Sequence, residues 1–271
     1  MFETPWIAAL AALFLWWFAT GILLWRVHAA DRSDDRDAHL WSVMLSLPLL
    51  LGGAFGIRET LGDASAQGVF LAFLSALALW AWVELAFLSG VIAGPISEPC
   101  PQGLTGWPRF TRALGTILWH EVLLLVIFAA LVWHGWDAPN AFGIWTWVLL
   151  FGARISAKLN LFFGVPRINT DFLPRPLAHL AGYFRKGPVS AFFPFSVTLL
   201  SFTTGCFIER LVRATDPAEV IGWTLLTALG SLALLEHWFM VWRVPDDKLW
   251  RWMIPSDRSP KKSLQEDPNG L

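Results

Sequence analysis

The residues best suited to chemistry in this chain are ionisable side chains inside long apolar runs. Arg154 and Lys158 fall in the last third of an apolar run from about residue 138 to residue 164. An arginine so far inside such a run costs about 2.5–3.5 kcal/mol on insertion scales, so it usually has a partner or a function. At 100° per residue, Arg154 and Lys158 share one helix face, while Ser156 and Asn160 share a nearly opposite face. A helix that is polar on two sides is expected at the centre of a bundle, away from lipid.

Other apolar runs carry ionisable residues at a similar depth. At 1.5 Å per residue, Glu84, His120, Arg154 and Glu236 lie about 10–18 Å in from the same side of the membrane. Because four different helices contribute them, we expect one buried polar cluster. Its predicted members are Glu84, His120, Glu121, Arg154, Lys158, Asn160, Glu236 and His237.

Such a cluster is first of all consistent with a structural network. Three carboxylates face two cations, and two histidines can take up the difference in charge. Buried ionic groups persist when they are paired and hydrogen-bonded, so this network would hold four helices in register. Lys158 has a further option, which is to extend to the cytoplasmic headgroups. Proton or ion translocation is another open interpretation.

A metal centre is a second interpretation, with weak ligand candidates. Carboxylates and imidazoles are ligands of di-iron and zinc centres. Bundle di-iron proteins, however, take Glu-x-x-His pairs from two helices, and no glutamate here has a histidine three residues later. Arg154 and Lys158 would also repel a cation. The candidates are Glu84, His120, Glu121, Glu236 and His237.

A pigment site is a third interpretation. His120 or His237 could ligate the magnesium of a chlorophyll-type pigment or a haem iron, among the 18 tryptophans and 21 phenylalanines. Aromatic side chains in membrane helices more often serve packing. The cofactor therefore stays open, with bacteriochlorophyll as the candidate.

Composition places these residues in a membrane protein. The chain of 271 residues is 55% hydrophobic and only 15% charged, with a mean hydropathy of +0.52. Soluble domains carry about 25% charged residues. The net charge of −1 argues against a nucleic-acid partner. Cys100 and Cys206 are expected on opposite sides of the membrane, so no disulfide is implied.

Seven apolar runs are long enough to span a bilayer, so we expect an all-α, seven-helix bundle in residues 1–254. Fifteen of the 20 Lys and Arg residues lie on one side of these runs, in the odd-numbered connections and the tail, and three on the other. This bias predicts a periplasmic N-terminus and a cytoplasmic C-terminus. The runs are Pro5–Val27, His39–Ile57, Ala66–Gly94, Pro108–His134, Pro139–Gly164, Ser190–Val212 and Pro217–Arg243.

Two further segments complete the expected organisation. In the connection Val165–Val189, apolar residues at i, i+3, i+4 and i+7 from Leu177 predict a short helix at the cytoplasmic interface. Residues 255–271 are polar and predict a disordered cytoplasmic tail.

Several short segments, taken in order, resemble the PuhE family of photosynthetic complex assembly proteins of purple photosynthetic bacteria. The resemblance extends from about the third span to Trp252, and the first two spans match mainly in hydropathy. The segments are Trp80–Phe87, His120–Glu121, Arg154–Asn160, Phe193–Ser196, Leu235–Phe239 and Leu249–Trp252.

The resemblance implies a function in the bacterial inner, intracytoplasmic membrane. It implies a gene near that of the reaction-centre H subunit, and a role in assembling the reaction centre and light-harvesting 1 complex. The expected partners are membrane lipids and the polypeptides of those complexes, and the mechanism would be docking of client helices or pigment. It assigns no catalytic residues, and a non-enzymatic role is favoured. The alternatives are a membrane metalloenzyme or accessory subunit of bacteriochlorophyll or carotenoid biosynthesis, and a bacteriochlorophyll carrier.

Overall fold

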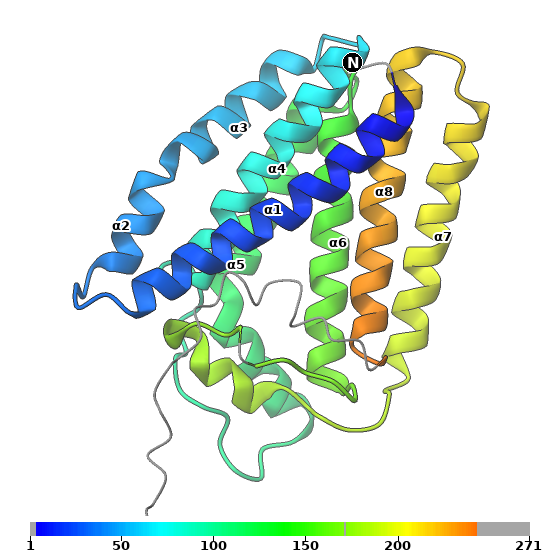
Figure 1. Ribbon diagram of the computed structural model, residues 1–271. Helices are drawn as coiled ribbons and strands as arrows, with labels where there is room; N and C mark the ends of the chain where they lie inside the picture. The colour runs from blue at the N-terminus through cyan, green and yellow to red at the C-terminus, as the bar shows by residue number, and fades with distance from the viewer. Residues whose placement is uncertain (1–3, 171, 243–271) are drawn as a thin grey trace, which may run out of the picture.

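The computed structural model describes residues 4–170 and 172–242, which form helices and no β-strand (Figure 1). The predicted tail 255–271, the segment Leu249–Trp252 and Arg243 lie outside the described residues. The helices are α1 Pro5–Asp31, α2 Ala38–Leu45, α3 Leu47–Thr60, α4 Ala66–Leu88, α5 Gly106–Gly135, α6 Phe142–Phe163, the 3-10 helix η1 Arg175–Tyr183, α7 Phe192–Arg213 and α8 Pro217–Phe239.

Six helical segments among the described residues are long and apolar enough to cross a membrane: α1, the pair α2–α3, α4, α5, α7 and α8. The helix α6 has 22 residues but is not among them, because Arg154 and Lys158 lower its mean hydropathy. The protein is therefore an all-helical, multi-pass membrane protein. The seventh span and the orientation of the termini stay predictions.

The sequence determines where several of these helices begin and end. The second run breaks into α2 and α3 around Ser46, because Pro48 lacks the N–H that would continue the helical hydrogen bonding. Ser65 caps α4 by accepting a hydrogen bond from the Gly68 N–H at 3.0 Å. The third run was expected to continue to Gly94, but α4 ends at Leu88, and Gly90 follows with a positive φ of 71°.

Helices α4 and α8 form the most buried part of the bundle. In their most apolar stretches 56% of residues are buried, against 17% in α1 and α5. The helix α6 contacts α4, α5, α7 and α8 (Figure 1). It was expected to be the central helix, but it shares that position with α4 and α8. Many of its residues stay partly exposed because they line a cavity.

The connection between α6 and α7 packs onto the bundle through η1. Leu177, Leu180 and Tyr183 are buried, and the first two join Phe87 and Ala93 in a small apolar core. The predicted α-helical face included residue 181, which is exposed. The 3-10 helix has three residues per turn, so the buried positions recur at every third residue. Both cysteines are free, as the sequence predicted.

Candidate functional site

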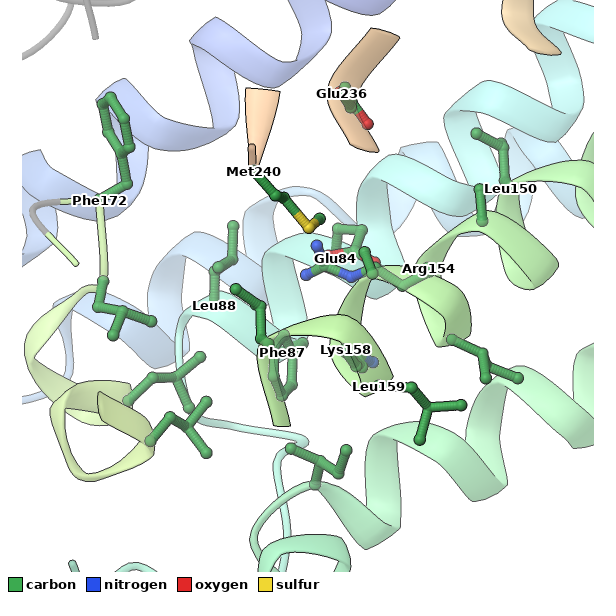
Figure 2. Close-up of a pocket in the computed structure, with 18 of the residues that line it drawn as sticks. Glu84, Phe87, Leu88, Leu150, Arg154, Lys158, Leu159, Phe172, Glu236 and Met240 are labelled. Atoms are coloured by element: carbon green, nitrogen blue, oxygen red, sulfur yellow. The ribbon is translucent and has the colours of Figure 1, made fainter. Parts of the chain in front are cut away.

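Two ion pairs connect α6 to the neighbouring helices. The Arg154 Nη2 donates a hydrogen bond of 2.7 Å to Glu84 Oε2 on α4, and the Lys158 Nζ donates one of 2.5 Å to Glu121 Oε1 on α5. Figure 2 shows Arg154 beside Glu84, with Lys158 one turn further along α6. The side chain of Glu84 is only 9% exposed, so the arginine offsets a carboxylate that is largely withdrawn from solvent.

The ring of Phe87 lies close to both cations and to a buried histidine. The Lys158 Nζ is 5.1 Å from the ring centroid, and the Arg154 Cζ is 5.9 Å from it. The ring of His120 also packs against Phe87, and the two ring centroids are 4.2 Å apart. The His120 side chain is fully buried, and neither ring nitrogen makes a hydrogen bond within the described residues. Its Nε2 is 3.9 Å from Glu84 Oε1.

The opposite face of α6 carries a neutral hydrogen-bond network. The Nδ1 of His237 is 2.8 Å from the Ala233 carbonyl, which can only accept, so Nδ1 carries the proton. Its Nε2 is then free to accept a hydrogen bond of 2.8 Å from the Ser156 hydroxyl. Nearby, the Asn160 amide donates to the Ser196 hydroxyl at 2.8 Å. These contacts connect α6 to α8 and α7.

The eight predicted cluster residues thus fall into three groups. On one side of α6, Arg154 and Lys158 meet Glu84, His120 and Glu121 from neighbouring helices. On the other side are Asn160 of α6 and His237 of α8. The eighth residue, Glu236, forms no hydrogen bond or ion pair with any residue that the structure describes. Phe87 and Ser196 also belong to these groups, and sequence reasoning missed both as site residues. Phe87 is three residues after Glu84 on the same helix face, which is the signal that could have identified it.

A cavity of about 1390 Å³ lies against the charged face of α6. Its wall includes Glu84, Arg154, Lys158 and Glu236, which Figure 2 labels, and also Glu121. Most of the remaining wall is apolar and comes from α1, α4, α5, α6, α8 and the connection that contains η1. The volume exceeds the range of about 300–1,000 Å³ that is typical of small-molecule sites.

The two predicted pigment ligands do not reach this cavity. His120 and His237 are 0% and 1% exposed, and neither is among the described residues of the cavity wall. Within the described residues, no group of three or more His, Cys, Asp or Glu side chains is arranged to hold a metal ion. The carboxylates that do face the cavity are Glu84, Glu121 and Glu236.

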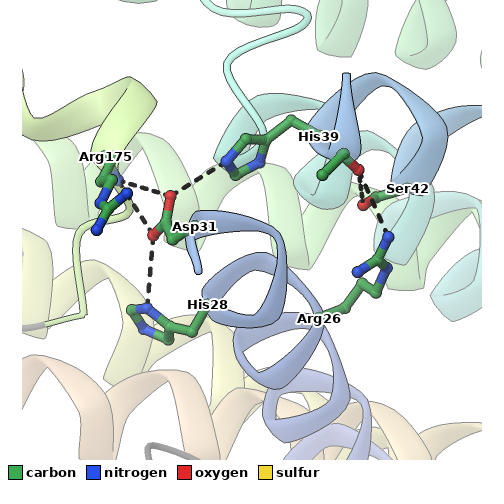
Figure 3. Close-up of polar contacts among 7 residues, drawn as sticks. Arg26, His28, Asp31, His39, Ser42 and Arg175 are labelled. Atoms are coloured by element: carbon green, nitrogen blue, oxygen red, sulfur yellow. Dashed lines mark hydrogen bonds and ion pairs between the residues drawn. The ribbon is translucent and has the colours of Figure 1, made fainter. Parts of the chain in front are cut away.

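A second polar group attaches the wall segment η1 to the end of α1 (Figure 3). Both carboxylate oxygens of Asp31 are 3.2 Å from the backbone N–H of Arg175, the first residue of η1. His39 at the start of α2 approaches the same carboxylate at 3.1 Å, and His28 at 3.7 Å. Asp31 therefore joins α1, α2 and η1, and no sequence pattern predicted this contact.

The far end of η1 is held by α5. The Arg109 guanidinium donates to the Tyr183 carbonyl at 2.5 Å and to the Phe162 carbonyl at 3.3 Å, and it lies over the Phe162 ring. The Tyr183 hydroxyl donates to the Glu98 carbonyl at 3.1 Å. Both ends of this part of the cavity wall are thus fixed to membrane helices.

Replacing Asp31 by alanine should loosen η1 without unfolding the bundle. The substitution removes charge-assisted hydrogen bonds worth about 1.5–3 kcal/mol when buried, and less at this partly exposed site. We expect faster amide hydrogen exchange across Arg175–Tyr183 and little change in α4 or α8, measured by mass spectrometry. Asp34→Ala, at an exposed position nearby, should change neither region. Unchanged exchange at η1 in Asp31→Ala would show that this contact does not hold the segment.

Comparison with known proteins now gives the family. The model of a family described as "Protein of unknown function (DUF3623)" matches residues 2–261. The chain belongs to the DUF3623 family. It is 52% identical to the "Uncharacterized 30.4 kDa protein in puhA 5'region" of Rhodobacter capsulatus, and the match covers 99% of this chain and 97% of that protein. No solved structure matches this DUF3623 chain.

Proposed function

We propose that this protein is a PuhE-type integral membrane assembly factor for the photosynthetic reaction centre and light-harvesting 1 complex. The observation that carries the proposal is the name of the Rhodobacter capsulatus relative, which places it in the 5' region of puhA. The resemblance to the PuhE family also implies that the gene of this protein lies near the gene of the reaction-centre H subunit. Identity of 52% over nearly the full length of both chains supports a shared role.

The structure suggests how such a factor would act. The ion pairs on α6 are satisfied inside the bundle, while α1 and α5 present large apolar side chains on the outside, among them Trp6, Trp25, Trp119 and Trp133. Membrane helices associate through packing and small residues. We infer that client helices or pigment dock on this outer surface or at the cavity.

Glycines could serve such docking, but three of them pack against other parts of this chain. Gly53 packs against the α4 backbone, Gly90 against Pro176, and Gly94 against the backbone of Gly115 and Thr116. A client would therefore contact other positions, such as Gly52, where a Cβ atom added to the residue would have no neighbour within 4 Å.

Affinity purification from photosynthetically grown cells tests the assembly role. Tagged protein, extracted in a mild detergent, should co-purify with reaction-centre or light-harvesting 1 polypeptides, and a deletion strain should accumulate less of the assembled complex. A tagged, unrelated membrane protein of similar size is the control. Normal complex levels in the deletion strain, together with no co-purified subunit, would contradict the proposal.

A bacteriochlorophyll carrier is the second candidate, and the size and aromatic content of the cavity favour it. Trp16, Trp80, Phe87 and Phe110 are among the rings in its wall. This candidate predicts co-purified pigment with a red-shifted absorption band. His120 does not line the cavity, so His120→Leu should leave this band in place. A plain assembly factor should carry no pigment.

A further inference from the structure

The cavity contains a carboxylate that the ion pairs leave unused. Glu236 lies in the wall on α8, and Figure 2 shows it with Met240 on the side of the cavity that faces Glu84 and Arg154. No described residue offers it a hydrogen bond or an ion pair. The cations on α6 are both engaged elsewhere, Arg154 with Glu84 and Lys158 with Glu121.

Glu84 on α4 also lines the cavity, but its unpaired oxygen is inaccessible to solvent and lies 3.9 Å from the Nε2 of the buried His120. The Oε1 of Glu84 is buried and makes no hydrogen bond within the described residues, because Arg154 binds the other oxygen. Buried polar groups without partners are rare in proteins, and a carboxylate in apolar surroundings requires a cation or a hydrogen-bond donor. Among the described residues of the wall, Glu236 is therefore the unpaired carboxylate that a donor in the cavity can reach.

The helical part of the cavity wall, as far as the structure describes it, carries one more carboxylate than cations. Three carboxylates, Glu84, Glu121 and Glu236, stand against two cations, Arg154 and Lys158. Two further cations, Arg167 and Lys186, line the cavity from the connection after α6. The described wall as a whole thus carries four cations against three carboxylates, and the preference for a donor depends on Glu236 itself. This carboxylate repels an anionic group placed beside it and can accept a hydrogen bond from an amine or a hydroxyl.

The remainder of the wall suits a long hydrocarbon. The cavity wall includes Leu149, Leu229, Met240 and Phe184, together with apolar side chains of α1 and α5. A volume of about 1390 Å³ holds an extended chain besides its polar end.

We propose that this cavity binds a long-chain amphiphile whose polar end is an amine or hydroxyl group that donates a hydrogen bond to Glu236. The cavity discriminates against the carboxylic acid of the same chain length. This inference rests on the cavity alone and stands whether or not the protein assists photosynthetic assembly.

Binding of three matched probes tests the inference. Full-length protein in nanodiscs of zwitterionic lipid is titrated with radiolabelled hexadecylamine, hexadecanol and hexadecanoic acid, and uptake by empty nanodiscs is subtracted. We expect one saturable site per chain, with the amine bound about tenfold or more tighter than the acid and the alcohol in between, because a site with unpaired acceptors rejects a ligand that cannot donate.

Glu236→Gln should lower the affinity for the amine about tenfold and that for the alcohol less than threefold. Glu209→Gln, at an exposed position on α7 outside the cavity wall, is the matched control and should bind like wild type. A second variant, Met240→Trp, narrows the cavity beside Glu236 and should weaken binding of the amine and the alcohol alike. Thermal unfolding shows whether each variant is folded.

Three results would overturn the inference. They are acid affinity equal to or above that of the amine in wild type, unchanged amine affinity in both Glu236→Gln and Met240→Trp, and uptake no greater than that of empty nanodiscs.

Discussion

Replacing Arg154 by alanine should lower the free energy of unfolding by about 3 kcal/mol, because it leaves a buried carboxylate without its cation. The Glu84 side chain is 9% exposed and its other oxygen has no hydrogen bond within the described residues, so the loss of Arg154 removes the hydrogen bond that this carboxylate accepts. The effect lies at the lower end of the usual range for a broken buried pair, since the Arg154 side chain is itself 33% exposed. Reversible unfolding in mixed detergent micelles, followed by circular dichroism, measures it.

An exposed ion pair of the same chain is the control for this loss. Arg213 pairs with Glu209 on α7, and their side chains are 79% and 47% exposed. Arg213→Ala should change stability by less than about 1 kcal/mol. If Arg154→Ala were equally mild, Glu84 would have to be neutral in the folded protein or paired with another group.

The second large effect is expected at the contact between α3 and α4. A Cβ on Gly53 would lie 2.7 Å from both the Leu79 nitrogen and the Ser75 carbonyl oxygen. Both are backbone atoms of α4 and cannot rotate away, so the two helices must separate. Gly53→Ala should therefore destabilise the protein by about 2–3 kcal/mol in the same unfolding assay, as overpacked cores do.

The adjacent glycine provides a matched control for that substitution. Gly52 is exposed on α3, with nothing within 4 Å of a new Cβ. Alanine should be neutral or stabilising there by about 0.5–1 kcal/mol, because it restricts the unfolded chain and favours the helix. Equal effects of the two substitutions would mean that α3 and α4 do not approach as closely as the structure shows.

Much of the helical architecture was predictable because apolar length and proline position act locally. The six apolar segments correspond to predicted spans, and a polar stretch from Arg154 to Asn160 identified α6 as unusual. The 100° spacing also separated its two polar faces before any partner was known. The break between α2 and α3 was not predicted, although Pro48, which cannot donate a helical hydrogen bond, indicates it.

The partners on these faces could not be predicted, because they depend on how each helix is rotated about its own axis. The sequence offered three carboxylates for two cations, and only packing assigns Glu84 to Arg154 and Glu121 to Lys158. The same rotation turns His237 toward Ser156 and leaves Glu236, its neighbour in sequence, facing the cavity. Asp31 was also missed, because its contact with η1 joins residues 144 positions apart.

A double-mutant cycle between Glu84 and Arg154 tests most directly whether charges on α6 pair across the bundle. Glu84→Gln, Arg154→Met and the double variant are compared with wild type in the unfolding assay, and the interaction energy is obtained by difference. Direct pairing predicts a favourable coupling of about 1–3 kcal/mol, with the double variant more stable than the sum of the single losses implies. Losses that add to within about 0.5 kcal/mol would contradict the pairing and the account of the cavity that depends on it.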